Sequence, residues 1–122
     1  MKKLNFIIIL SLFIFIIPSY SFSQEYEVTD IGDLEGGYSR AMKINNLEQI
    51  VGWSTTLDDY HIFLYENGEM RDLGNPGGYG AYNIRIRNFN NAEQVLGSYT
   101  SYGDGEDMCF CMKAENIKIL IV

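Results

Sequence analysis

Two stretches of the sequence decide the fold: Asn45-Asn46-Leu47-Glu48-Gln49-Ile50-Val51-Gly52 and, 45 residues later, Asn90-Asn91-Ala92-Glu93-Gln94-Val95-Leu96-Gly97. Five of the eight aligned positions are identical and the other three are conservative. Each copy begins with a pair of asparagines, which favour turns, and continues into a β-prone run that ends at glycine. The chain therefore predicts a β structure built from two copies of one sequence repeat.

Three further elements recur in the same order. Asp30-Ile31-Gly32 returns as Asp72-Leu73-Gly74, Gly36-Gly37-Tyr38 returns as Gly77-Gly78-Tyr79, and the segment around Phe63 returns around Phe110. The spacing between equivalent positions grows along the chain, which places small insertions around residues 81–87 and 102–107 of the second copy. We divide the chain into a first repeat over residues 24–69 and a second, more diverged repeat over residues 70–122.

Turn signals separate the expected strands. His61 to Tyr65 is followed by Asn67-Gly68, which suits a two-residue hairpin turn because both residues tolerate positive φ. Met70 to Leu73 is then the returning strand. No segment after residue 23 shows sustained helical periodicity, so we expect an all-β fold of short antiparallel strands. The two repeats would form propeller-blade-like units or a small β-sandwich.

The repeat pattern resembles the HAF repeat of bacterial extracellular proteins. The first copy carries Asp30-Ile31-Gly32, Gly36-Gly37-Tyr38-Ser39-Arg40-Ala41, Gln49-Ile50-Val51-Gly52, His61-Ile62-Phe63 and Tyr65-Glu66-Asn67-Gly68. The second copy departs more, with Met108 at the histidine position. Both copies have Glu48 or Glu93 where the family has glycine, so we expect that turn not to require a left-handed residue. The resemblance implies an extracellular, propeller-like β repeat and brings no catalytic residues with it.

The N-terminus has the layout of a secretory signal peptide. Lys2 and Lys3 precede an apolar run from Leu4 to Ile17, which is about 21 Å long as a helix and too short for a ~30 Å hydrocarbon core. Small residues follow, with Ser23 the first choice for the cleavage position and Ser21 the second. We therefore expect residues 1–23 to be removed, and the mature chain to be secreted or periplasmic.

The mature chain would be strongly acidic. The full sequence has 16 acidic and 9 basic residues, and two of the lysines would leave with the signal peptide. This charge argues against nucleic acid and against an anionic membrane as partners, because both require a basic surface.

Candidate reactive residues are few. His61 is the only histidine, and we expect it to have a packing or hydrogen-bonding role at the start of a strand. Cys109 and Cys111 lie two apart on one face of a strand. We expect them to be small core residues in the places of Ile62 and Leu64, with a strained bridge or an intermolecular disulfide as the alternatives.

Three other features have a structural interpretation. The acidic stretches Asp58-Asp59 and Asp104 to Asp107 lack the ligand spacing of a calcium loop, so we expect solvated loops. The paired glycines predict turns or close backbone approach. The tyrosines and Trp53 are expected mainly to pack, although an aromatic, acidic surface is also suited to carbohydrate.

We therefore expect a non-catalytic binding or structural module with no cofactor or metal, and with a protein or a glycan as partner. The alternative is a small secreted hydrolase acting on glycans. No catalytic residue can be singled out, and structural roles in the repeat are assigned to Gly36, Gly37, Asn45, Gly52, His61, Phe63, Gly68, Gly77, Gly78, Asn90, Gly97 and Phe110.

The apolar run Lys118 to Val122 predicts a final strand with an unprotected edge. Three outcomes are open. The run folds back against Tyr26-Glu27-Val28 and closes a small sandwich or barrel, or it pairs with a second copy of the protein. In the third outcome the chain is a truncated remnant of low stability.

Overall fold

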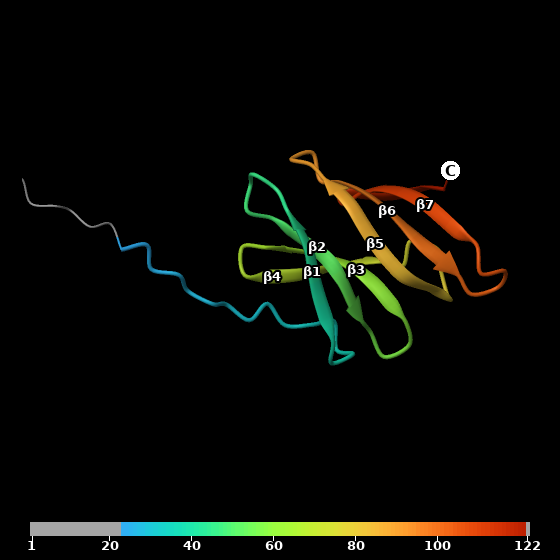
Figure 1. The fold of residues 1–122 in the computed structure, drawn as a ribbon, viewed down its shortest axis with the longest axis horizontal. Coiled ribbons are helices and arrows are strands. Elements are labelled where there is room, and N and C mark those ends of the chain that lie inside the picture. Colours follow the sequence, from blue (N-terminus) through green and yellow to red (C-terminus); the bar gives the residue numbers. More distant parts are fainter. Residues whose placement is uncertain (1–22, 122) are drawn as a thin grey trace, which may run out of the picture.

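The computed structural model describes residues 23–121, and these form two four-stranded antiparallel sheets with no helix (Figure 1). In each sheet, neighbouring strands follow one another in the sequence. The first sheet contains β1 (Ser39–Ile44), β2 (Ile50–Thr55), β3 (Tyr60–Glu66) and β4 (Glu69–Gly74). The second contains β5 (Ala81–Phe89), β6 (Gln94–Ser101), β7 (Asp107–Lys113) and β8 (Asn116–Ile121). The predicted all-β fold is confirmed, and the arrangement resembles a small sandwich.

Several of the hairpin turns contain residues in the left-handed conformation. Asn67 and Gly68 have φ angles of 51° and 83°, as the two-residue turn between β3 and β4 requires. Before β2, the Asn45 side chain accepts hydrogen bonds from the backbone N–H groups of Leu47 and Gln49, both at 3.0 Å. Asn90 makes the equivalent bonds before β6. The asparagines therefore act as the local turn formers that the sequence indicates.

One expectation about these turns is wrong. Glu48 and Glu93 have φ angles of 61° and 56°, so the turn does use a left-handed residue in both copies. The reason is the tight return of the chain, in which Asn45 and Asn90 each accept a backbone hydrogen bond from the glutamate three residues later. This left-handed conformation is unfavourable for residues other than glycine, because the Cβ atom comes too close to the following carbonyl oxygen.

The two sheets pair their strands in the same register. Arg40 faces Trp53 and Ala41 faces Gly52 in the first sheet, while Arg85 faces Ser98 and Ile86 faces Gly97 in the second. Both first strands also carry an irregularity directly after these pairs. The second sheet has an additional one between Tyr82 and Arg85, where the sequence indicates an insertion.

The sheets pack head to tail. We call the side of each sheet that carries Phe63 or Phe110 the phenylalanine face, and the other side the opposite face. The phenylalanine face of the second sheet contributes Val95, Phe110 and Met112 to the core. The first sheet contributes Val51, Ile62 and Leu64 to the same core, and these belong to its opposite face. The phenylalanine face of the second sheet therefore packs against the opposite face of the first sheet. The phenylalanine face of the first sheet and the opposite face of the second sheet have no sheet against them.

The sequence boundary between the repeats does not coincide with the boundary between the sheets. β4 begins at Glu69 and pairs with β3, so the segment up to Gly74 belongs to the first sheet. The hairpin at Asn67-Gly68 keeps β3 and β4 together. The structural division therefore falls in the connection between Gly74 and Ala81.

The C-terminal strand does not close the fold onto the N-terminus. β8 pairs with β7, whereas residues 23–38 are in no strand. Residues 23–30 extend away from both sheets (Figure 1), and residues 34–38 run along β2, where the Leu34 backbone N–H donates to Ser54 Oγ at 2.8 Å and the Gly36 backbone N–H donates to the Thr55 carbonyl at 3.1 Å. Closure against Tyr26-Glu27-Val28 is thus contradicted within the described residues, because these three residues form no strand and the strand paired with β8 is β7. The signal-peptide prediction falls on residues 1–23, of which only Ser23 is described. Within residues 23–121 no helix is long and apolar enough to cross a membrane.

Candidate functional site: an aromatic surface at the end of the two sheets

A cluster of aromatic rings begins on the first sheet. Trp53 on β2 lies between Tyr38 and Tyr60, with ring centroids 5.5 Å apart in both pairs. The Trp53–Tyr60 pair is edge to face, which is a favourable arrangement for aromatic rings. Trp53 is half-buried against the core, while Tyr60 and Tyr38 are exposed. Trp53 is thus held against the core and packs against two exposed tyrosines.

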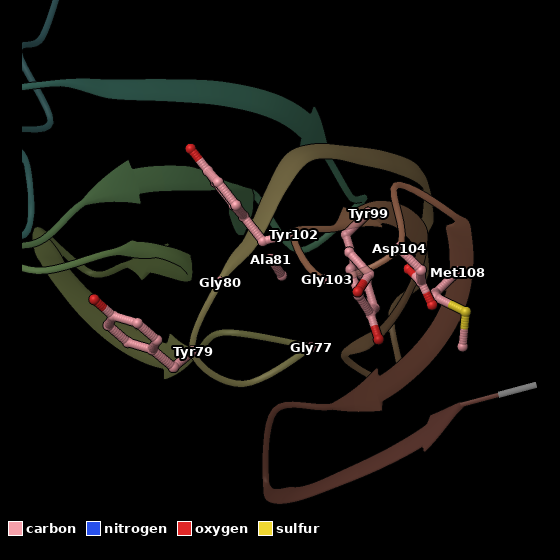
Figure 2. Close-up of a pocket in the computed structure, with 10 residues that line it drawn as sticks. Gly77, Tyr79, Gly80, Ala81, Tyr99, Tyr102, Gly103, Asp104 and Met108 are labelled. Atoms are coloured by element: carbon pink, nitrogen blue, oxygen red, sulfur yellow. The ribbon is translucent and has the colours of Figure 1, made fainter.

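The second sheet adds rings at the same end of the molecule. Tyr82 on β5 and Tyr102 in the β6–β7 loop pack edge to face with centroids 4.9 Å apart. In Figure 2, Tyr79 and Tyr102 extend away from Tyr99 and Met108. A hollow of about 430 Å³ is lined by Tyr60, Tyr79, Tyr82 and Tyr102, with Asp58 and Asp59 on its rim. We call Trp53 and these four tyrosines the aromatic surface.

A second hollow continues the aromatic surface along the strands. It measures about 540 Å³ and shares Tyr60 and Tyr82 with the first, and Trp53, Arg40 and Arg85 also line it. The two hollows are neighbours because they share Tyr60 and Tyr82, and we call them together the trough. Asp58 and Asp59 line the first hollow, and Arg40 and Arg85 line the second.

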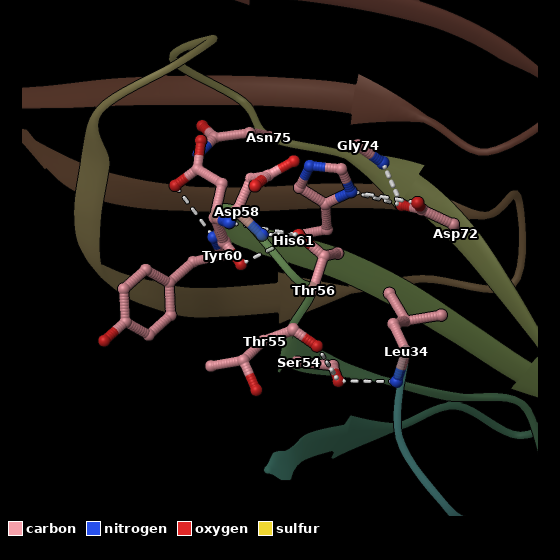
Figure 3. Close-up of polar contacts among 11 residues, drawn as sticks. Leu34, Ser54, Thr55, Thr56, Asp58, Tyr60, His61, Asp72, Gly74 and Asn75 are labelled. Atoms are coloured by element: carbon pink, nitrogen blue, oxygen red, sulfur yellow. Dashed lines mark hydrogen bonds and ion pairs between the residues drawn. The ribbon is translucent and has the colours of Figure 1, made fainter. Parts of the chain in front are cut away.

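Asp59 holds the loops of the aromatic surface together. Its carboxylate accepts hydrogen bonds from Asn75 Nδ2 at 3.0 Å and from the Gly80 backbone N–H at 3.4 Å. It also accepts a bond from the Tyr60 backbone N–H at 2.8 Å (Figure 3). The loop between β2 and β3 is therefore tied to the connection between the sheets, which positions Tyr60 relative to Tyr79. Neighbouring Asp58 is exposed.

A separate acidic hollow of about 480 Å³ lies beside His61. The His61 Nδ1 atom on β3 is 2.9 Å from Asp72 Oδ2 on β4, and Asp72 also accepts a hydrogen bond from the Gly74 backbone N–H (Figure 3). Within residues 23–121, the imidazole hydrogen bonds are to Asp72 alone. The geometry is that of a cross-strand pair with an oriented imidazole, and no hydroxyl in the described part of the chain bonds to the ring.

Groups of three or more histidine, cysteine or acidic side chains that could hold a metal ion are absent from residues 23–121.

The acidic loop after β6 is organised by its own backbone. The Asp104 carboxylate accepts a hydrogen bond from the Glu106 backbone N–H at 3.2 Å. This bond, followed by one from the Ser101 side chain, lowers the pKa of Asp104 below its ordinary value.

The cysteines lie on the face opposite to the expected one. Cys109 is exposed, Cys111 is half-buried and both are free, whereas Phe110 and Met112 between and beside them are buried. The head-to-tail packing is the reason, because the second sheet meets the first through its phenylalanine face. The positions equivalent to Ile62 and Leu64 therefore lie on the outside of the second sheet.

The paired glycines have two distinct structural roles. Gly37 and Gly78 have φ angles of 78° and 69°. A Cβ on Gly36 would collide with the backbone of Thr55, and a Cβ on Gly77 would lie 2.7 Å from the Tyr99 ring carbon Cζ. The second glycine of each pair thus permits the turn, and the first permits close packing.

The remaining repeat positions form the turns and the core. Asn45 and Asn90 form the turns before β2 and β6, Gly68 is in the β3–β4 turn, and His61 pairs with Asp72. Phe63 and Phe110 are almost fully buried, directly opposite Gly52 and Gly97. None of these residues lines the hollow of about 430 Å³ between Tyr60 and Tyr102.

Two groups of neighbouring side chains were not predicted from the sequence. Sequence reasoning did not bring Tyr60, Tyr82 and Tyr102 together, because they lie on different strands and loops. It also missed a polar bridge between the turns: the buried Gln49 donates from Nε2 to Glu66 and to Glu93, both at 2.8 Å. The recurrence of Glu-Gln in both copies is the only signal that pointed to this bridge.

Comparison of the chain with protein-family models, with curated proteins and with solved structures finds no significant match.

Proposed function

We propose that this protein is an exported, non-catalytic binding module of the HAF-like repeat type, and that it binds a glycan through the aromatic surface. Export is supported by the layout of residues 1–23, and the repeat type by the sequence pattern of the first copy. The strand registers of the two sheets are compatible with a repeated unit.

The observation that carries the proposal is the trough between Tyr60, Tyr79, Tyr82 and Tyr102. Ligand sites combine apolar and aromatic walls with a few polar groups that fix orientation. Tyrosine rings offer flat apolar faces to the C–H groups of a sugar ring, and Asp58 offers acceptors for its hydroxyl groups. Arg40, which lines the second hollow, would donate hydrogen bonds to an acidic or hydroxyl substituent of the sugar.

A glycan array followed by titration tests this proposal. Trp53 is the only tryptophan and packs on Tyr60, so its fluorescence should change when a sugar enters the trough. Tyr82→Ala should weaken binding about tenfold or more, as loss of a central aromatic anchor does. Tyr26→Ala is the matched control, because Tyr26 is exposed and its hydrogen bond is to Gln24, outside the trough.

Two results would contradict the proposal. Binding that is unaffected by Tyr82→Ala would place the ligand elsewhere. Turnover of glycan substrates, abolished by changing one carboxylate, would support the hydrolase alternative.

A further inference from the structure

Two unlike faces have no sheet packed against them, and each has a buried counterpart within the same chain. On the phenylalanine face of the first sheet, the segment before β1 covers the end at Ser54, where the Leu34 backbone N–H donates to Ser54 Oγ, and the other end of the face stays open. On the phenylalanine face of the second sheet, Phe89, Val95 and Met112 form a row of paired residues and are almost fully buried against the first sheet. The same row in the first sheet is Ile44, Ile50 and Tyr65. This row is also apolar, yet Ile44 is 64% exposed and the other two are partly exposed.

The opposite face of the second sheet shows the complementary situation. In the first sheet, Val51, Ile62 and Leu64 on this face are fully buried against the second sheet. Their counterparts by strand register are Leu96, Cys109 and Cys111. Leu96 is 48% exposed, Cys109 is exposed and Cys111 is half-buried.

Three polar contacts join the two sheets, and the groups that make them recur in both copies of the repeat. Within the chain, Asn45 Nδ2 donates to the Asn90 carbonyl at 3.2 Å, and the Asn46 backbone N–H donates to Asn91 Oδ1 at 3.1 Å. Gln49 Nε2 donates to Glu93 Oε1 at 2.8 Å.

Every group needed to repeat these three bonds between two chains is present. The donors would be Asn90, Asn91 and Gln94 of one copy, all of which are exposed here. The acceptors would be Asn45, Asn46 and Glu48 of the next copy, which occupy the positions of Asn90, Asn91 and Glu93 in the other sheet.

We propose that a second copy of this chain docks the phenylalanine face of its first sheet, at Ile44, Ile50 and Tyr65, onto the Leu96, Cys109 and Cys111 face of the second sheet. The contact repeats the packing that already joins the two sheets within one chain. Such a head-to-tail contact is heterologous, so it either closes into a ring or continues as a filament. Two or three copies would supply four or six sheets, which is within the size range of closed β-propellers.

Analytical ultracentrifugation of the purified protein, in the form that the cell releases, tests this inference. The wild type should self-associate with rising concentration, into a discrete dimer or trimer where the contact closes into a ring and into larger species where it continues as a filament. Ile44→Glu and Leu96→Glu each place a charge in one face and should weaken self-association about tenfold or more. Val28→Glu is the control, because Val28 is 96% exposed and belongs to neither face. Circular dichroism checks that each variant keeps its strands.

Mixing the two variants distinguishes a head-to-tail contact from other modes. An Ile44→Glu chain keeps its Leu96 face, and a Leu96→Glu chain keeps its Ile44 face, so the mixture should form a one-to-one complex that neither variant forms alone. In the wild type, Cys109 and Cys111 should become slower to alkylate as the protein concentration rises.

Three results would overturn the inference. The first is a monomer at all concentrations. The second is an oligomer that is unaffected by either substitution, including one that dissociates only when β8 is deleted, because pairing through the C-terminal edge would then be responsible. The third is an oligomer that is sensitive to only one of the two substitutions, because like faces would then meet.

Discussion

The ring of Phe63 lies over Gly52, its directly paired neighbour on β2, and the ring of Phe110 covers Gly97 on β6 in the same way. A Cβ on Gly52 would be 2.8 Å from Phe63 Cζ, and a Cβ on Gly97 would be 2.6 Å from Phe110 Cζ. The glycine that ends the β-prone run in each repeat is therefore required by packing against an aromatic ring. Neither glycine has a positive φ, so the requirement is steric.

Gly52→Ala and Gly97→Ala should each destabilise the protein by about 1–3 kcal/mol, because a methyl group would overpack the site. In both cases the added Cβ also meets the carbonyl oxygen of the neighbouring strand, at Arg40 or Arg85. Chemical denaturation gives the free energy of unfolding. Ser98→Ala, at a half-buried position beside Gly97, is the control and should change stability by less than about 0.5 kcal/mol. Equal stabilities of the alanine variants and the wild type would show that the rings can move aside.

The turns and strands could be predicted from local residues, but the side of each strand that points into the core could not. Asn45, Asn67 and Gly68 have turn preferences that act over a few residues, and the structure confirms them. On β3, by contrast, Ile62, Phe63 and Leu64 are apolar and all fully buried, so the strand shows no alternation that would identify the core side.

The position of Cys109 and Cys111 depends on how the sheets pack. Sequence alignment with Ile62 and Leu64 correctly gives their place on the strand, but the equivalent face is interior in one sheet and exterior in the other. The aromatic surface was missed for a related reason. Tyr60 and Tyr82 come together only when the sheets pack.

Glu48→Gly should stabilise the protein by about 0.5–1 kcal/mol, because Glu48 has a φ of 61° and glycine adopts this region without strain. Glu93 has a similar φ of 56°, but its carboxylate accepts from Gln49 at 2.8 Å and lies 3.4 Å from Arg71. Glu93→Gly should therefore gain less stability or lose some. Thermal and chemical unfolding of both variants measure the difference, and equal stabilisation by the two would show that the Glu93 contacts contribute nothing.

Gly37→Val and Gly78→Val should both destabilise the protein, by about 1–2 kcal/mol, since a β-branched residue is strained at positive φ. An added Cβ has no atom within 4 Å at either site, so backbone strain is the only cost and the two effects should be similar. Gly37→Asn is a useful comparison because asparagine tolerates this region better. An unchanged thermal midpoint for either valine variant would contradict the turn assignment at that site.

Export should remove the N-terminal segment. N-terminal sequencing of the released protein is expected to begin at Gln24, or at Phe22 if cleavage follows Ser21 instead. Ser23→Pro, which blocks a small-residue cleavage position, should slow processing at the first site. Recovery of a chain that starts at Met1 from the membrane fraction would refute the export prediction.

Gln49 and Gln94 occupy equivalent positions and should respond differently to the same substitution. Gln49 is 6% exposed, and its Nε2 group donates to both Glu66 and Glu93, so Gln49→Ala leaves two neighbouring carboxylates without their shared donor. We expect a loss of about 1–3 kcal/mol in the free energy of unfolding. Gln94 is exposed, and Lys113 stands where the first sheet has Glu66, so Gln94→Ala should cost less than about 0.5 kcal/mol in a dilute, monomeric sample. If copies dock head to tail, however, Gln94 takes the role of Gln49 towards Glu48 of the next copy. Gln94→Ala should then weaken self-association in ultracentrifugation while leaving the unfolding of the monomer nearly unchanged. A variant with unchanged self-association would show that this bridge forms only within the chain.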